Sequence, residues 1–254
     1  AGLESLESAR VLTIGDNPQL ASLEALGSLV SVAEAVTIEG NPSLINLDGL
    51  NGLTTVQSDL IIERNDSLTS LEAFDSLTSI GGDFFLEENG SLETLEGLNT
   101  LVSVGGHLRI WRNVGLESID AFESLARVGR DVIIRNNYSL LNVNGLNGLS
   151  ELQGSLSIEG NDSLDSIEAF GSLTAVQTLM ISDNQSLTSL DGLESLVSIG
   201  WGGMMLHSNG QLTSIDALAN LTTISGPCEI YNNTALSTIE SLSSLTSLGS
   251  SLGL

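Results

Sequence analysis

Lysine is absent from this 254-residue sequence, and its seven basic residues are all arginines, against 32 acidic residues. The net charge of −25 excludes nucleic acid as a partner and argues against anionic membrane surfaces, because both bind clustered cations. Cysteine occurs once, as Cys228, which excludes an internal disulfide framework and a cysteine-rich zinc site.

Long hydrophobic runs are also missing. No apolar stretch reaches the roughly 18 residues of a membrane-spanning helix, and the opening AGLESLES is neither basic nor hydrophobic. We therefore expect no direct membrane insertion and no intact signal peptide in this sequence.

What the sequence does contain is one unit repeated ten times. Its reference point is an asparagine followed three residues later by leucine, at spacings of 24 with one exception of 23 and one of 25. Apolar residues stand five and three positions before it and three, six, nine, twelve and fifteen after it. The ten asparagines are Asn17, Asn41, Asn65, Asn89, Asn113, Asn137, Asn161, Asn184, Asn209 and Asn233.

Apolar steps of three do not fit an amphipathic helix, and only the segment before each asparagine alternates as a strand does. The pattern predicts an all-β solenoid, a parallel β-helix whose turns, or rungs, stack about 4.8 Å apart. We expect one domain over residues 1–254, belonging to a longer array or surface protein. Its rungs are predicted at about 11–34, 35–58, 59–82, 83–106, 107–130, 131–154, 155–177, 178–202, 203–226 and 227–250.

The recurring asparagine is interpreted as structural. A carboxamide both donates and accepts, so an internal column of asparagines can satisfy backbone groups where each rung turns. We expect Phe74, Phe122 and Phe170, which recur in alternate rungs, to pack in the core, and Cys228 to be a small buried hydrophobe.

Stretches such as LVSVGGHLRIWRN, LTSIGGDFFLEENGSLETLEGL and LARVGRDVIIRNNYSL resemble the L-domain repeats of epidermal growth factor and insulin receptor ectodomains, and their relatives in bacterial and fungal surface proteins. The resemblance implies a right-handed, leucine-rich-repeat-like β-helix displayed outside the cell or at its surface, with bacterial members closest. Unlike ordinary leucine-rich repeats, this chain has leucine three residues after the asparagine and no expected outer helix. The receptors' cysteine-rich modules are absent, so growth-factor binding is not carried over.

The candidate binding surface consists of the outward positions four, two and one before each asparagine. Four of the seven arginines fall there, beside aromatic residues typical of binding hot spots. The predicted binding residues are Ile61, Glu63, Arg64, Phe85, Glu87, Arg109, Trp111, Arg112, Ile133, Arg135, Met205 and His207. Two alternatives stay open: the arginines balance glutamates on neighbouring rungs, or the face mediates self-association. Trp201, beside an extra residue, is a second contact point or a plug.

An acidic residue stands seven positions after the asparagine in nine of the ten rungs. We expect this column to lie at a solvated corner and to bond local N–H groups. Calcium bridging between rungs is the alternative, since hard cations prefer carboxylate oxygens. No other cofactor or metal site is predicted.

Catalytic signatures are not found, since His107 and His207 lie four rungs apart and no Ser-His-Asp cluster appears. We therefore expect a non-enzymatic extracellular binding or adhesion module that presents its strand face to a protein or glycan. The alternative is a scaffold or filament subunit that stacks end to end, because neither end shows a polar cap.

Overall fold

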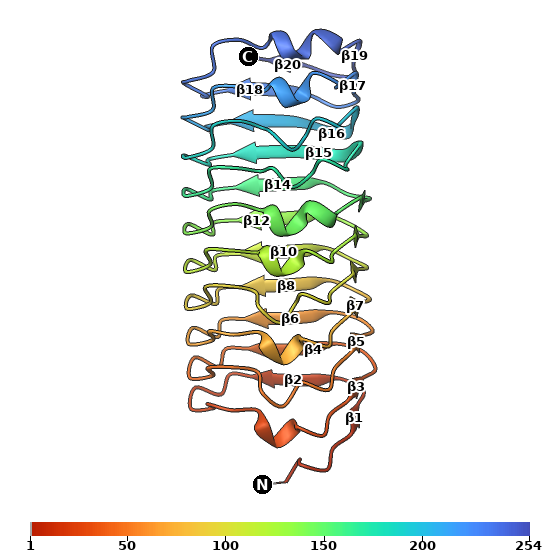
Figure 1. The fold of residues 1–254 in the computed structure, drawn as a ribbon, viewed down its shortest axis with the longest axis vertical. Helices are drawn as coiled ribbons and strands as arrows, with labels where there is room; N and C mark the ends of the chain where they lie inside the picture. Colours follow the sequence, from red (N-terminus) through yellow and green to blue (C-terminus); the bar gives the residue numbers. More distant parts are fainter. Residues whose placement is uncertain (1) are drawn as a thin grey trace.

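The computed structural model describes residues 2–254 and shows a single stack of similar turns (Figure 1). The rungs follow one another along the long axis, with the two termini at opposite ends of the stack. Residues 24 apart pair in register, as Leu12 does with Val36. The predicted all-β, leucine-rich-repeat-like solenoid of about ten rungs is confirmed.

The main sheet is built from the segment that precedes each ladder asparagine. Its strands pair in parallel, each with the strand one rung away. They are β2 (Leu12–Gly15), β4 (Val36–Glu39), β6 (Leu60–Glu63), β8 (Phe84–Glu87), β10 (Leu108–Trp111), β12 (Val132–Arg135), β14 (Leu156–Glu159), β15 (Ala175–Ser182), β16 (Ser198–His207), β18 (Cys228–Tyr231) and β20 (Leu252–Gly253).

Strand alternation separates core from surface in this sheet. In β6, Leu60 and Ile62 are fully buried, whereas Ile61 and Glu63 are half-buried on the outer side. Because side chains alternate with a period of two, in-register stacking places equivalent positions of all the strands on the same face. The positions four and two before the asparagine therefore lie on the outer side of the sheet, as expected, here at Ile61 and Glu63.

A second sheet of two-residue strands runs along another edge of the stack, and the sequence analysis did not predict it. Six of the seven strands end on the apolar residue fifteen positions after the asparagine, and β1 precedes the first asparagine; all are too short to show alternation. Seven strands form it: β1 (Ser8–Ala9), β3 (Ser31–Val32), β5 (Thr55–Val56), β7 (Ser79–Ile80), β9 (Ser103–Val104), β11 (Arg127–Val128) and β13 (Glu151–Leu152).

The two sheets merge in the rungs of irregular length. In β15 and β16 the corner between the sheets is straightened into one strand, and β17 (Thr223–Ile224) and β19 (Ser247–Leu248) continue from β16. A register shift lies between Val176 and Thr178, where β15 pairs with β16. One rung is a residue shorter here and the next is a residue longer than the usual 24. The strands of these two rungs can therefore pair on both sides of the irregularity only because a bulge absorbs the difference.

Short 3₁₀ turns lie on the side opposite the main sheet, where we expected no helix. No α-helix occurs within residues 2–254. Leucines spaced by three match the three-residue period of a 3₁₀ turn, which keeps successive apolar side chains on one side. The turns are η1 (Glu24–Leu26), η2 (Glu72–Phe74), η3 (Asp120–Phe122), η4 (Asn144–Gly148), η5 (Asp216–Leu218) and η6 (Glu240–Ser244).

The asparagine ladder is confirmed, and its bonds link neighbouring rungs. Asn89 donates its backbone N–H to Oδ1 of Asn113 at 3.1 Å. Its Nδ2 donates to the carbonyls of Ile62 at 3.0 Å and Glu87 at 2.9 Å. From Asn41 to Asn209 these side chains are fully buried, so each carboxamide satisfies backbone groups that water cannot reach.

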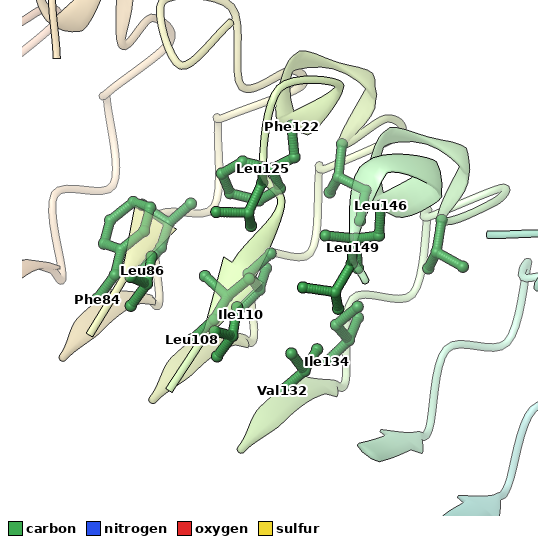
Figure 2. Packing of buried hydrophobic residues seen from close by; sticks show 14 of the residues in the cluster. Phe84, Leu86, Leu108, Ile110, Phe122, Leu125, Val132, Ile134, Leu146 and Leu149 are labelled. Carbon is green, nitrogen blue, oxygen red and sulfur yellow. The ribbon is translucent and has the colours of Figure 1, made fainter. Parts of the chain in front are cut away.

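The core fills the interior along the whole stack. Phe74, Phe122, Phe170 and Cys228 are fully buried, which confirms their interpretation as core residues. Figure 2 shows successive rungs whose inward side chains repeat in columns: Phe84 and Leu86, Leu108 and Ile110, Val132 and Ile134. Within the described residues, no helix is long and apolar enough to cross a membrane.

Candidate functional site

The predicted binding residues on β6, β8, β10 and β12 come together on the outer face of the main sheet. Register places them in two rows, since Phe85 pairs with Arg109 and Glu87 with Trp111. We call this group the central patch. It contains Ile61, Glu63, Arg64, Phe85, Glu87, Glu88, Arg109, Trp111, Arg112, Ile133, Arg135 and Asn136.

The central patch is close to neutral in a strongly acidic molecule. It holds four arginines against three glutamates, Glu63, Glu87 and Glu88, whereas the whole chain has a net charge of −25. Because the rest of the molecule is strongly negative, a negatively charged partner meets less electrostatic repulsion at this patch than at the acidic remainder of the surface.

Arg109 is held toward β8. Its Nε donates to Glu87, whose side chain is only 3% exposed, and its guanidinium lies over the Phe85 ring, 4.5 Å from the centroid. The ion pair and the cation–π contact together fix a side chain that would otherwise be mobile.

Arg135 is held in the opposite direction, toward β14. Its Nη2 donates to Glu159, which also accepts a hydrogen bond from Ser157. The Nε of Arg135 is buried and has no hydrogen-bond partner. Arg109 and Arg135 therefore lean away from each other, although their strands are neighbours.

The other two arginines are also paired. Arg64 contacts Glu39 and lies 3.5 Å from Glu63, and Arg112 donates to Glu88 at 3.0 Å. Arg112 also lies 5.4 Å from the centroid of the Trp111 ring. These half-exposed pairs contribute about 0–1 kcal/mol each, so they orient the side chains more than they stabilise the fold. The structure thus contains the arginine–glutamate pairs that the charge-balancing alternative describes. These pairs hold the arginine side chains of the patch in defined positions.

Backbone strain accompanies three of these charges. The residue before every ladder asparagine has a positive φ, including Arg64 at 55°, Glu88 at 53° and Arg112 at 56°. Most other rungs place Gly, Asn or Asp there, which tolerate this region best. Long charged residues on three adjacent rungs each cost on the order of 1 kcal/mol of strain, and such strain is concentrated at functional sites.

Glu63 lies among like charges on β6. Burial raises the pKa of its carboxyl group above the ordinary value of 4.5, and the charges of Glu87 and Glu88 raise it further, while Arg109 opposes them. The patch therefore contains a carboxylate whose charged form is disfavoured, and neighbouring cations reduce the free-energy cost of its ionisation.

Two hollows open on this face. One, of about 360 Å³, lies between β10 and β12 and is lined by Arg109, Trp111, Ile133, Arg135 and Asn136. The other, of about 370 Å³, lies along the corner after the strands and is lined by Arg64, Asp66, Glu88, Gly90, Arg112 and Val114. The concave parts of the patch therefore lie beside its arginines.

Met205 and His207 are not part of the central patch. They lie on β16, four strands beyond Trp111, where His207 stacks on Tyr231 with ring centroids 4.7 Å apart. Ser182, on the strand between Glu159 and His207, is 1% exposed, and its hydroxyl has no hydrogen-bond partner. Ser182 and His207 thus lack the hydrogen bond of an activated nucleophile.

Sequence reasoning missed Glu88, Ser157 and Glu159 as members of the arginine network. The signal was present: opposite charges stand one rung apart, as in Arg112 and Glu88 or Arg135 and Glu159, each pair 24 residues apart. A search for opposite charges at the repeat length would have found them.

The acidic column lies at an exposed corner, as predicted, but its bonding differs. At this corner the N–H of Asp120 donates to the Ser118 hydroxyl at 3.0 Å, and the N–H of Glu72 donates to the Ser70 hydroxyl in the same way. Asp216 accepts from Ser241 on the next rung at 2.5 Å, a bond that lowers its pKa. No group of three or more potential metal ligands gathers within residues 2–254.

A second polar ladder lies at the corner before the main sheet and was not predicted. Asp83 donates its N–H to Asp59 Oδ1 at 2.8 Å, and His107 donates its N–H to Asp83 Oδ1 at 2.8 Å. Ser155 donates likewise to Asp131 at 2.7 Å. His107 belongs to this ladder, so its place is explained by rung stacking.

Trp201 does not plug the stack. It is 79% exposed, on the inserted residue of β16, and lies outside the central patch. The interpretation of Trp201 as a plug is therefore wrong, and that of a second contact point stays a prediction.

No protein-family model matches the sequence, and no curated protein is significantly similar to it. Among solved structures, an internalin from Listeria monocytogenes is 19% identical, with 92% of this chain and 71% of that chain covered and a TM-score of 0.42. TLR13, solved in its complex with ssRNA13, is 15% identical, with 87% and 50% covered and a TM-score of 0.21. Neither similarity is close enough to support an inference about function.

Proposed function

We propose that this chain is a non-enzymatic binding module, displayed outside the cell or at a bacterial cell surface, which presents the central patch to a protein or glycan. The observation that carries the proposal is an ordered, nearly neutral patch of four arginines, Trp111 and Phe85 within a molecule of net charge −25. Tryptophan and arginine dominate binding hot spots, and arginines already held by glutamates lose little conformational freedom on binding.

Matched tryptophan variants test this proposal. The protein is screened on protein and glycan arrays, and each positive is then titrated with the parent, Trp111→Ala and Trp201→Ala. Trp111 is partly exposed and Trp201 is 79% exposed, so both variants should fold, which far-ultraviolet circular dichroism checks. We expect Trp111→Ala to weaken binding about tenfold or more and Trp201→Ala, outside the central patch, to weaken it much less. Equal affinities for all three proteins would contradict the proposal.

A further inference from the structure

The ion pairs of the central patch open the hollow between β10 and β12. Arg109 and Arg135 stand on adjacent strands, and unpaired side chains there would both extend over the gap between them. Instead Glu87 draws Arg109 over β8 and Glu159 draws Arg135 over β14. The hollow that remains has Trp111 and Ile133 between two arginine side chains, with Asn136 at the end of β12.

The arginine side chains of this groove offer hydrogen-bond donors, while the carboxylates that hold them are engaged. The Glu87 side chain is 3% exposed, and Glu159, 18% exposed, already accepts from Arg135 and Ser157. What faces outward is the apolar surface of Trp111 and Ile133, together with guanidinium N–H groups that the glutamates do not use. A ligand in this groove must therefore combine an apolar group with oxygen atoms that accept hydrogen bonds.

We propose that this groove receives one large apolar or aromatic side chain of a protein partner, whose neighbouring main-chain carbonyl groups accept hydrogen bonds from Arg109, Arg135 and the Asn136 amide. The inference rests on the proposed function of the central patch. A volume of about 360 Å³ admits one such side chain. Carbonyl groups carry no net charge, so the acidic remainder of the molecule does not repel them as it would repel carboxylates.

A glycan fits this chemistry less well. Sugar hydroxyl groups donate as well as accept, and a buried hydroxyl without an acceptor is costly. Here the two nearest carboxylates are already engaged by arginines. A carbonyl oxygen only accepts, and therefore matches the guanidinium groups of Arg109 and Arg135, which only donate.

The chain provides its own optical reporter, because it has two tryptophans, Trp111 and Trp201. In a Trp201→Phe background, fluorescence comes from Trp111 in the groove. Peptides are selected from a random displayed library on the parent protein, synthesised, and titrated against this variant. Neutral oligosaccharides, including cellotriose, are titrated in parallel.

We expect the selected peptides to share one large apolar residue and to shift Trp111 emission saturably. Replacing that residue by alanine should weaken binding about tenfold, as should Ile133→Ala in the protein. Ile45→Ala is the matched control, because Ile45 is an exposed isoleucine outside the main sheet and outside the groove, and its effect should stay below about threefold. Ile61→Ala, at the equivalent position on β6, tests for a contact elsewhere on the central patch and should have a smaller effect than Ile133→Ala.

Three outcomes would overturn the inference. If the peptides bind without changing Trp111 emission, or if their binding depends on Ile61 as much as on Ile133, the contact lies elsewhere on the face. The proposed function is then unaffected. A saturable response to the oligosaccharides alone makes the groove a glycan site. Failure to enrich any peptide excludes binding through a side-chain anchor. The proposed function is still tested separately by the array experiments with the tryptophan variants.

Discussion

At the scale of the residue, the ladder asparagines use both ends of the carboxamide. Asn113 donates from Nδ2 to the Leu86 carbonyl at 2.8 Å and from its backbone N–H to Asn137 Oδ1 at 3.0 Å. Its own Oδ1 accepts from the backbone N–H and Nδ2 of Asn89. Because every partner is buried, no water replaces a lost bond.

Asn113→Ala should therefore destabilise the protein by about 4 kcal/mol, since it leaves at least two buried backbone groups without partners. Asn147→Ala, on the exposed outer side of a rung, is the control and should change stability by less than about 0.5 kcal/mol. Urea unfolding measures both. Similar midpoints for the two variants would show that the ladder contributes little.

Glu63 gives a pH-dependent prediction. Its folded-state pKa is raised by burial and by Glu87 and Glu88, so ionisation costs stability as the pH rises above the ordinary value of 4.5. Below that value the carboxyl is protonated in both states and the cost disappears. Glu63→Gln should thus gain stability relative to the parent on going from about pH 4 to about pH 7. A relative stability that is constant, or that falls over this range, would show that the Arg64 contact dominates.

At the scale of the element, the corner between the sheets depends on backbone shape. Gly203 in β16 has φ of 79°, and a Cβ there would lie 2.1 Å from the carbonyl oxygen of Pro227 on the next rung. The inserted residue of this rung is accommodated only because glycine permits both the left-handed backbone and the close approach.

Gly203→Ala should cost about 2 kcal/mol or more, the sum of a left-handed alanine and a backbone clash. Gly171→Ala is the matched control because nothing lies within 4 Å of a Cβ at that position. Thermal unfolding of both variants measures the difference. If Gly203→Ala has the same melting temperature as the parent protein, the bulge does not depend on this glycine.

At the scale of the whole molecule, net charge opposes the compact state. The net charge is −25, and rungs stacked about 4.8 Å apart hold acidic residues close to one another. Each arginine–glutamate pair contributes at most about 1 kcal/mol of stability against this repulsion. Self-repulsion should therefore outweigh the surface ion pairs.

Added salt should accordingly raise the melting temperature. Going from about 0.01 M to about 1 M shortens the Debye length from about 30 Å to about 3 Å and screens the repulsion. The control is the same series near the isoelectric point of 4.1, where the effect should shrink. Melting temperatures that fall with salt at neutral pH would mean that the ion pairs dominate.

The architecture was predictable because its signal repeats ten times. Inward columns such as those of Leu60 and Ile62 keep an apolar residue in every rung, and only a stacked coil places such residues inside. The second sheet was not predictable, because two-residue strands such as β5 are too short to carry a pattern. The 3₁₀ turns were missed although leucines spaced by three match their period, because this spacing occurs in every rung and only some rungs form such a turn.

The sequence by itself determined the rung length, the buried asparagine column and the residues that face outward, since these follow from local alternation and a fixed repeat. Only the tertiary structure decided how the outward side chains are arranged. Arg135 and Glu159 lie 24 residues apart in the chain and become neighbours only when rungs stack. The direction in which each arginine leans, and with it the groove beside Trp111, depends on those contacts between rungs.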